Sequence, residues 1–329
     1  MSQRGATLRA GFAGSLAAAL MAATGAQAQD LKIWRQAMIA PKADAGFFLM
    51  AARRGFAEKE GLKIEVVDVK DDQVGMRALL SGEVDSFDSA TGGITATARG
   101  ADAKMVGCPW LSVPYVVLAR TGITKMEGLR GKTIAASAPG TPPDVVARAS
   151  LAAFKVPDAE VKFAAVGGDR DRYNALLGGI VDAAVVSDEY TPLPSSKSLN
   201  VLVEAKQVLP KWVRFCTLMN GKALTARRAD AVAFLTAEIK AFRFAVSHRE
   251  ETIKLTREVT DAAADDPRPA YVFDEGVKPG VVAPDFPIPI ESLTFMRDRL
   301  IEVGQIPKTD VAKMLDADLR AQALERIGK

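Results

Sequence analysis

Residue types that carry catalysis are scarce in this 329-residue chain. It has one histidine, His248, and no Cys-x-x-Cys pair, so an ordinary zinc site cannot be assembled. Neither a Gly-x-Ser-x-Gly nucleophile elbow nor a Gly-x-x-x-x-Gly-Lys-Ser/Thr phosphate loop is present. Asp188 and Glu189 are sequence neighbours, a poor arrangement for two carboxylates that must face one substrate from opposite sides. The residues therefore predict a non-enzyme that uses no cofactor and no metal.

Four short segments instead have the composition of ligand-contacting loops. Three of them are rich in Ser, Thr and Gly, whose short side chains let a ligand reach backbone N–H groups. Each follows a predicted strand, and the dipole of a following helix favours negative charge there, so an anionic ligand group is expected. The segments are Gln36–Asp44, Ser89–Gly92, Ser137–Thr141 and Ser187–Tyr190. The candidate ligand-binding residues in and beside them are Trp34, Pro41, Lys42, Asp44, Ser89, Ala90, Thr91, Ser137, Gly140, Thr141, Asp188, Glu189, Tyr190 and Arg214.

Each kind of candidate also has an ordinary structural interpretation. The Ser and Thr hydroxyls could cap helices, a role worth about 1 kcal/mol each without any ligand. Lys42 and Arg214 could be solvated surface cations, and the aromatic candidates could pack in a core. Asp188 and Glu189 could meet a ligand ammonium group, a cation from the opposite lobe, or a helix N-terminus.

An internal repeat indicates how these segments are positioned. The stretch Ala78–Ser86 recurs as Ala175–Ala183, at an offset of 97 residues. At the same offset Leu62–Val66 pairs with Ala159–Phe163, and both have the alternating pattern of a strand. Two matches at one offset predict that one architecture is used twice.

Each copy is expected to alternate strands with helices. In the first copy the predicted strands are Leu31–Gln36, Lys63–Val69 and Val84–Asp88, and the predicted helices are Ala45–Lys59, Gln73–Leu80 and Gly93–Arg99. In the second copy the strands are Thr133–Ala136, Val161–Val166 and Ala183–Val186, and the helices are Pro143–Phe154 and Arg172–Leu177. Such alternation implies parallel pairing through right-handed crossovers. The predicted fold class is therefore α/β, with two doubly wound lobes.

Extended segments are expected to link the two lobes. Lys104–Trp110 and Tyr115–Arg120 would lead to the second lobe, and Leu199–Glu204 and Val213–Met219 would lead back. Lobe 1 is thus predicted from residues 29–123 plus 208–329, and lobe 2 from residues 124–207. The remaining predicted helices are Arg227–Ser247, Glu250–Val259, Ile290–Gly304 and Thr309–Gln322, with a loop at Pro279–Pro289.

The N-terminus predicts export. A basic start with Arg4 and Arg9 precedes a short apolar stretch and the small-x-small triplet Ala26–Ala28, so residues 1–28 are expected to be a cleaved signal peptide. Cleavage would remove two of the 43 basic residues and none of the 40 acidic ones, which leaves a net charge of +1. A near-neutral mature chain argues against nucleic acid or an anionic membrane surface as a partner. The expected location is the periplasm.

Two cysteines, Cys108 and Cys216, leave two possibilities open. An oxidising compartment permits one disulfide between them, but the sequence does not show that their Cα atoms approach each other. The alternative is two small buried apolar residues.

The assembled motifs resemble the solute-binding proteins of ABC importers, in the branch of sulfonate, taurine, nitrate and thiamine-precursor binders. The similarity runs over nearly all of residues 30–325. The segments that show it are Gly55–Leu62, Leu80–Asp85, Ala98–Asp102, Gly128–Ala135, Gly178–Ala184 and Leu300–Gly304.

This resemblance implies a type II periplasmic-binding fold that holds a small organic anion or zwitterion in an interlobe cleft. It also implies delivery of the solute to a membrane permease by a monomeric binding protein. The cleft loops implied by the resemblance are Pro41–Asp44, Ser89–Gly92, Ser137–Thr141 and Ser187–Tyr190. Branch members often have a Trp after the third strand of the second lobe, whereas this chain has Val186–Glu189. A thiamine-pyrimidine precursor binder, a synthase-like protein and a LysR-type effector domain remain as alternatives.

Overall fold

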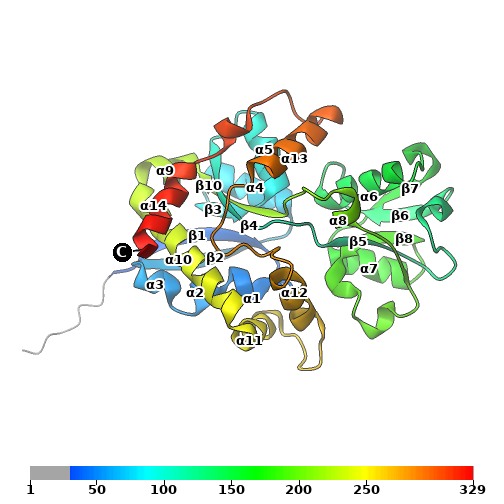
Figure 1. Ribbon diagram of the computed structural model, residues 1–329, viewed down its shortest axis with the longest axis horizontal. Coiled ribbons are helices and arrows are strands. Elements are labelled where there is room, and N and C mark those ends of the chain that lie inside the picture. Colours follow the sequence, from blue (N-terminus) through cyan, green and yellow to red (C-terminus); the bar gives the residue numbers. More distant parts are fainter. Residues whose placement is uncertain (1–29, 329) are drawn as a thin grey trace, which may run out of the picture. The chain divides into compact units, whose positions relative to one another are not determined.

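Two five-stranded sheets organise the part of the chain described in the computed structural model, residues 30–328 (Figure 1). The strands of sheet A are, in spatial order, β2 (Leu62–Val69), β1 (Lys32–Ile39), β3 (Ser86–Asp88), β10 (Phe215–Asn220) and β4 (Ala103–Trp110). The strands of sheet B are β7 (Lys162–Ala165), β6 (Thr133–Ala136), β8 (Ala183–Ser187), β5 (Tyr115–Ala119) and β9 (Asn200–Glu204). We call each sheet with its helices a lobe: lobe 1 contains sheet A and lobe 2 contains sheet B.

The first three strands of each sheet pair in parallel, as the repeat predicts. Strand β1 pairs with β2 over its whole length and with β3 at Gln36 and Ala37. Strand β6 pairs in the same way with β7 and β8. The carboxyl ends of these strands therefore meet at one edge of each sheet, where ligands of parallel α/β sheets bind.

The segments expected to link the lobes belong to the sheets themselves, and this corrects the prediction. Strands β10 and β4 extend sheet A in the antiparallel sense, and β5 and β9 do the same for sheet B. Both sheets are therefore mixed. The predicted boundary after residue 123 is also wrong, because β5 pairs with β8 in sheet B. The chain passes between the sheets at residues 111–114, before β5, and returns between β9 and β10.

The predicted helix Ala45–Lys59 is divided into three short helices. These are α1 (Ala45–Phe48), α2 (Met50–Arg53) and α3 (Phe56–Lys59). Gly55, the residue before α3, has a φ of 76°, a left-handed conformation that interrupts the helix and that glycine adopts without steric cost. The next helices are α4 (Asp72–Ser81) and α5 (Ala90–Ala98), and α4 ends as predicted at Gly82 with a φ of 80°.

Lobe 2 has the predicted pair of longer helices together with several short turns. The longer helices are α6 (Pro142–Ala153) and α7 (Asp169–Leu177). Proline at the first turn of α6 suits a helix start, where the missing N–H costs no hydrogen bond. The short elements are η1 (Met126–Leu129), η2 (Asp158–Glu160), η3 (Asp188–Tyr190), η4 (Pro194–Ser196) and α8 (Ala205–Val208).

The C-terminal part is helical and packs on lobe 1. Its elements are α9 (Gly221–Ala226), α10 (Arg228–Ser247), α11 (Arg249–Thr260), α12 (Arg268–Val277), α13 (Ile290–Glu302), η5 (Val311–Met314) and α14 (Ala317–Gly328). Helix α10 is buried along most of its length, and Phe234 stacks on Trp34 of β1 with ring centroids 4.9 Å apart. Helix α12 was not predicted, because its short run lies between Pro267 and the Pro-rich loop.

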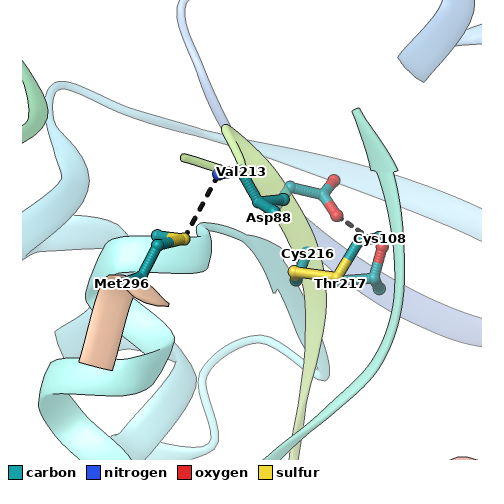
Figure 2. The surroundings of a disulfide bond; sticks show 6 residues. All are labelled: Asp88, Cys108, Val213, Cys216, Thr217 and Met296. Atoms are coloured by element: carbon teal, nitrogen blue, oxygen red, sulfur yellow. Dashed lines mark hydrogen bonds between the residues drawn. A yellow bond between two sulfur atoms is a disulfide. The ribbon is translucent and has the colours of Figure 1, made fainter. Parts of the chain in front are cut away.

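Cys108 and Cys216 form a disulfide, which decides between the two possibilities left open by the sequence. They lie on the neighbouring antiparallel strands β4 and β10, where the register shifts between Phe215 and Thr217 (Figure 2). The bond closes a loop of 108 residues that contains all of sheet B. It therefore fixes to each other the two strands that connect lobe 1 to lobe 2.

The predicted signal peptide, residues 1–28, lies outside the described residues. Between residues 30 and 328, none of the helices is long and apolar enough to cross a bilayer.

Candidate ligand-binding site

A cavity of about 540 Å³ lies at the carboxyl ends of the parallel strands of both sheets. Its wall combines strand ends of sheet A with the segments that precede α5, α6 and α7, so both lobes contribute. Polar and charged residues of the wall include Gln36, Lys42, Asp44, Asp88, Ser89, Thr91, Tyr115, Ser137, Thr141, Asp169, Arg172 and Arg214.

The structure brings half of the predicted site residues together in this wall. Six of them come from three of the predicted loops and one lies outside the loops. They are Lys42, Asp44, Ser89, Thr91, Ser137 and Thr141, together with Arg214. The predicted residues that lie elsewhere in the described chain are Trp34, Pro41, Ala90, Gly140, Asp188, Glu189 and Tyr190. Pro41 and Ala90 are sequence neighbours of wall residues, and Ala90 is itself buried in the core.

Two aromatic candidates pack in cores, which corrects their predicted role. Trp34 is fully buried against α10, and its indole N–H donates to the Ser86 hydroxyl at 2.9 Å. Tyr190 is 6% exposed and packs on Tyr173 at a centroid distance of 4.6 Å. Both are large side chains buried in core clusters and absent from the cavity wall, so core packing rather than ligand contact explains their positions.

The Ser and Thr hydroxyls of the cavity wall have hydrogen-bond partners within the protein, and these partners differ in kind. Ser89 caps α5 by accepting from the Gly92 N–H at 3.0 Å, as the structural interpretation predicts. Thr141 precedes α6, but its hydroxyl donates to the Ala138 carbonyl at 2.6 Å instead. Thr91 accepts from the indole N–H of Trp212 at 3.2 Å.

Asp169 is the centre of a charged cluster that joins the lobes. It begins α7, is 4% exposed, and pairs through one carboxylate oxygen with Arg172 and through the other with Lys42. Lys42 lies in the loop after β1 and so belongs to lobe 1. Burial raises the pKa of Asp169, but Lys42 and Arg172 outweigh it and hold this pKa at about 2. The cluster is therefore charged at neutral pH.

Arg214 is a buried cation rather than a solvated one. Its side chain is 10% exposed and pairs with Asp44, 8% exposed, at 2.6 Å. The guanidinium also lies 4.4 Å from the ring centroid of Phe215. Burial lowers the pKa of Arg214, but Asp44 and Tyr115 outweigh it and raise the pKa above its ordinary value. It is a fixed positive charge in the cavity wall.

Asp188 and Glu189 line a smaller cavity of about 130 Å³ beside the first. Asp44 and Arg214 contribute to both cavities. Glu189 accepts from the backbone N–H of Ala43 at 3.3 Å, a second contact between the lobes. Burial raises the pKa of Asp188 and of Glu189 to about 7, with neighbouring carboxylates adding to the effect.

Several wall residues were missed by the sequence reasoning. Asp88 was treated as a strand residue, and Gly167–Arg172 as a turn followed by a helix. Gln36 was placed at the junction of a predicted strand and the segment Gln36–Asp44, but it was not among the candidate residues. A signal existed for Gly167–Arg172, because Asp169 and Arg172 have the i, i+3 spacing of an ion pair at a helix start. For Gln36 the signal was a polar residue at a position where the strand alternation required an inward side chain.

The fold and cavity define a class: two-lobed α/β proteins of the periplasmic-binding type. Residues 42–252 match the family described as "NMT1/THI5 like", and the chain belongs to that family. The resemblance and fold class inferred from the sequence are thereby confirmed. No curated protein sequence matches the chain.

Solved structures share the fold at low sequence identity. The periplasmic nitrate-binding protein NrtA from Synechocystis PCC 6803 is 15% identical with a TM-score of 0.75, covering 91% of this chain and 89% of that one. The periplasmic aliphatic sulphonate binding protein SsuA from Escherichia coli is 19% identical with a TM-score of 0.69, covering 88% and 99%. The desulfurization enzyme DSZB is 12% identical with a TM-score of 0.66, covering 90% and 99%. At these identities the likeness shows the fold alone.

Proposed function

We propose that the protein is the extracytoplasmic solute-binding subunit of an ABC importer. It captures a small organic anion or zwitterion, such as a sulfonate or carboxylate, and delivers it to a membrane permease. The observation that carries this proposal is the cavity itself, to which both lobes contribute helix starts and buried cations. Nitrate binding by NrtA and aliphatic sulphonate binding by SsuA agree with it. A periplasmic location follows from the predicted signal peptide.

The cavity wall supports an anionic group on the ligand. The segments that begin α5, α6 and α7 place Ser89, Thr141 and Asp169 at its edge, and helix starts present N–H groups and a positive dipole end. The buried cations Arg214 and Arg172 add fixed charge. Each is already paired with an Asp, however, so neither cation is left uncompensated in the wall. A zwitterion suits such a wall as well as a simple anion does.

Capture by lobe closure follows from the division of the wall between the lobes. A ligand favours the closed state only through contacts that it makes with both lobes. Two contacts within the protein also join the lobes. The Lys42–Asp169 ion pair and the Ala43–Glu189 hydrogen bond each connect the loop after β1, in lobe 1, to lobe 2. They would add to the ligand's own contacts in stabilising the closed state.

The alternatives named from the sequence receive less support. A synthase would need reactive groups at the cavity, whereas His248 ends α10 and stacks on Phe244 with ring centroids 3.7 Å apart. The resemblance stated above includes binders of thiamine precursors. A pyrimidine precursor of thiamine therefore stays within the proposed function as one class of ligand. The described residues contain no group of acidic, His or Cys side chains able to hold a metal.

A thermal-shift screen tests the proposal directly. The purified mature protein is heated with a panel of sulfonates, carboxylates, nitrate and small zwitterions. A true ligand at a hundredfold excess over its Kd should add about 2.7 kcal/mol of stability. Small-angle scattering of the saturated protein should then show a smaller radius of gyration. Failure of every anion and zwitterion to stabilise the protein would contradict the proposed function.

A further inference from the structure

Two polar side chains in the cavity wall are explained neither by helix capping nor by ion pairing. Gln36, on β1, and Asp88, the last residue of β3, both line the cavity. The Gln36 amide donates to one oxygen of Asp88 at 3.2 Å. The Thr217 hydroxyl donates to the other oxygen at 2.6 Å, as Figure 2 shows. Both donors are neutral, and among the described residues no cation forms an ion pair with Asp88. Its negative charge is thus hydrogen-bonded but not neutralised.

Gln36 carries an unused acceptor. The side chain is 4% exposed, and within residues 30–328 its Oε1 has no hydrogen-bond partner. The hydrogen bond to Asp88 fixes the amide orientation, because only the NH₂ group can donate to a carboxylate. Buried carbonyl oxygens in native proteins are nearly always hydrogen-bonded, so this one indicates a missing donor.

We propose that Gln36 and Asp88 form an acceptor subsite that binds an N–H donor of the ligand, for which a primary ammonium group is the best fit. This inference rests on the proposed function and narrows its ligand class. The subsite offers acceptors, whereas the helix starts and cations elsewhere in the same wall offer donors and positive charge. A molecule that satisfies both parts carries an amine and an acidic group together, and is a zwitterion.

The charge of Asp88 suits a cationic partner. Burial raises the pKa of Asp88 to about 6, and the hydrogen bonds from Thr217 and Gln36 oppose that rise. The carboxylate is still largely ionised at neutral pH, and a bound ammonium group would stabilise the ionised form further. Hydrogen bonds between charged partners are stronger than those between neutral ones, so a simple anion would leave the stronger interaction of this subsite unmade.

A rival explanation for the unpartnered Oε1 of Gln36 is an internal water that bonds to both Gln36 and Glu238. Glu238 lies on α10, is 2% exposed, and also has an Oε1 without a partner among the described residues. We do not expect Glu238 to contact the ligand, because it lies outside the cavity wall. Burial raises the pKa of Glu238 well above its ordinary value, which favours its neutral form, so Glu238→Gln is a close replacement and serves as the matched control.

The experiment compares matched probes by isothermal titration calorimetry on the mature protein. The pairs are ethanesulfonate and taurine, propionate and β-alanine, and benzoate and 4-(aminomethyl)benzoate. For the pair of suitable length, the amine-bearing member should bind at least about tenfold more tightly at pH 7.5. Asp88→Asn and Gln36→Met should each reduce that preference severalfold, and Glu238→Gln should keep it.

Each result has a defined meaning. Binding of acids without any preference for the amine overturns the subsite but leaves the proposed function. A preference that survives both Asp88→Asn and Gln36→Met, or that is lost only in Glu238→Gln, also overturns it. If no member of any pair binds, the proposed function fails and the subsite fails with it. Melting curves without ligand show whether each variant folds. If a variant does not fold, the preference of the unmodified protein for the amine-bearing probe decides the outcome.

Discussion

The protonation of each buried acid at the cavity depends on whether neighbouring cations outweigh the effect of burial. Asp169 sits between two cations and keeps its charge, with a pKa of about 2. Asp188 and Glu189 are adjacent to each other and far less compensated, so burial raises the pKa of each to about 7. Both kinds of acid lie where the two lobes meet, and their contributions to the stability of the fold change with pH in opposite directions.

The first prediction concerns these raised pKa values. The folded pKa of Glu189 lies above its unfolded value of 4.5, so the folded state binds more protons between pH 4.5 and pH 7. Stability should therefore fall as pH rises through this window, by up to about 1.4 kcal/mol per pH unit for each proton. The double variant Asp188→Asn/Glu189→Gln should flatten that slope in urea unfolding measured from pH 4.5 to 8.

A control variant separates this effect from general charge changes. Glu250 is an exposed acid, with a side chain 87% accessible, and Glu250→Gln should leave the slope unchanged. An unaltered slope in the double variant would show that Asp188 and Glu189 titrate at ordinary pH values. Asp169 contributes the opposite dependence, since its depressed pKa gives stability that is lost only as pH falls below 3.8 toward 2.

At the scale of elements, each repeated helix ends in a tight turn that aligns the next strand. Gly82 after α4 has a φ of 80°, and its counterpart in the second copy, Gly179, has a φ of 71°. Both lead into a strand whose carboxyl end reaches the cavity or its border. In contrast Gly178 has a φ of −74° and corresponds to Ser81 of the first copy, so its backbone conformation suits any residue, although a Cβ there would lie 3.2 Å from the Asn174 carbonyl oxygen.

The second prediction follows from this pair of turns. Gly82→Ala and Gly179→Ala should each lower the free energy of unfolding by about 1 kcal/mol, because an L-residue is strained in the left-handed region. A Cβ at Gly82 would meet its nearest neighbour, the Asn220 amide, only at 3.9 Å, so strain rather than collision causes the loss. Gly178→Ala is the matched control and should cost less than about half as much. Equal losses at Gly178 and Gly179, measured by urea unfolding, would contradict the explanation.

At the scale of the molecule, the disulfide ties together the two strands that lead to and from lobe 2. Beside it, Thr217 holds Asp88 in the cavity wall, and Met296 of α13 accepts from the Val213 N–H at 3.2 Å (Figure 2). The return crossing between the lobes is therefore anchored to lobe 1 by covalent and hydrogen bonds. Movement between the lobes would have to occur outside this anchored segment.

The third prediction is the cost of losing this bond. Cys108→Ala/Cys216→Ala should lower the free energy of unfolding by roughly 2–5 kcal/mol, because the unfolded chain regains the freedom of a 108-residue loop. Mass spectrometry of the unmodified protein should show a gain of two hydrogens only after reduction. Free thiols in the native, oxidised protein would disprove the pairing.

Most strands and longer helices could be predicted from the sequence because their signals are local. Strand β6 was predicted with the bounds it has, and α4 ends at the glycine that the pattern indicates. Strands β4, β5, β9 and β10 were located almost correctly, but their sheet membership was not. Antiparallel pairing between strands far apart in the sequence depends on which edges are left open, and a local pattern does not contain that information.

The site was predictable at the level of loops and less so at the level of residues. Composition and helix starts led to Ser89 and Thr141, because helix-start chemistry is encoded within a few residues. Asp88 was missed, and Gln36 was included only as the first residue of the segment Gln36–Asp44, since a strand position becomes part of a cavity only when its sheet and the opposite lobe meet.

The sequence by itself determined the repeated strand–helix unit, its turns, and the family to which the chain belongs, because each depends on short-range spacing. Only the tertiary structure decided that Cys108 and Cys216 are bonded, that Trp34 and Tyr190 are core residues, and that Lys42 meets Asp169. These are contacts between residues distant in the chain. Their partners are selected by packing, which brings together side chains that no periodicity relates.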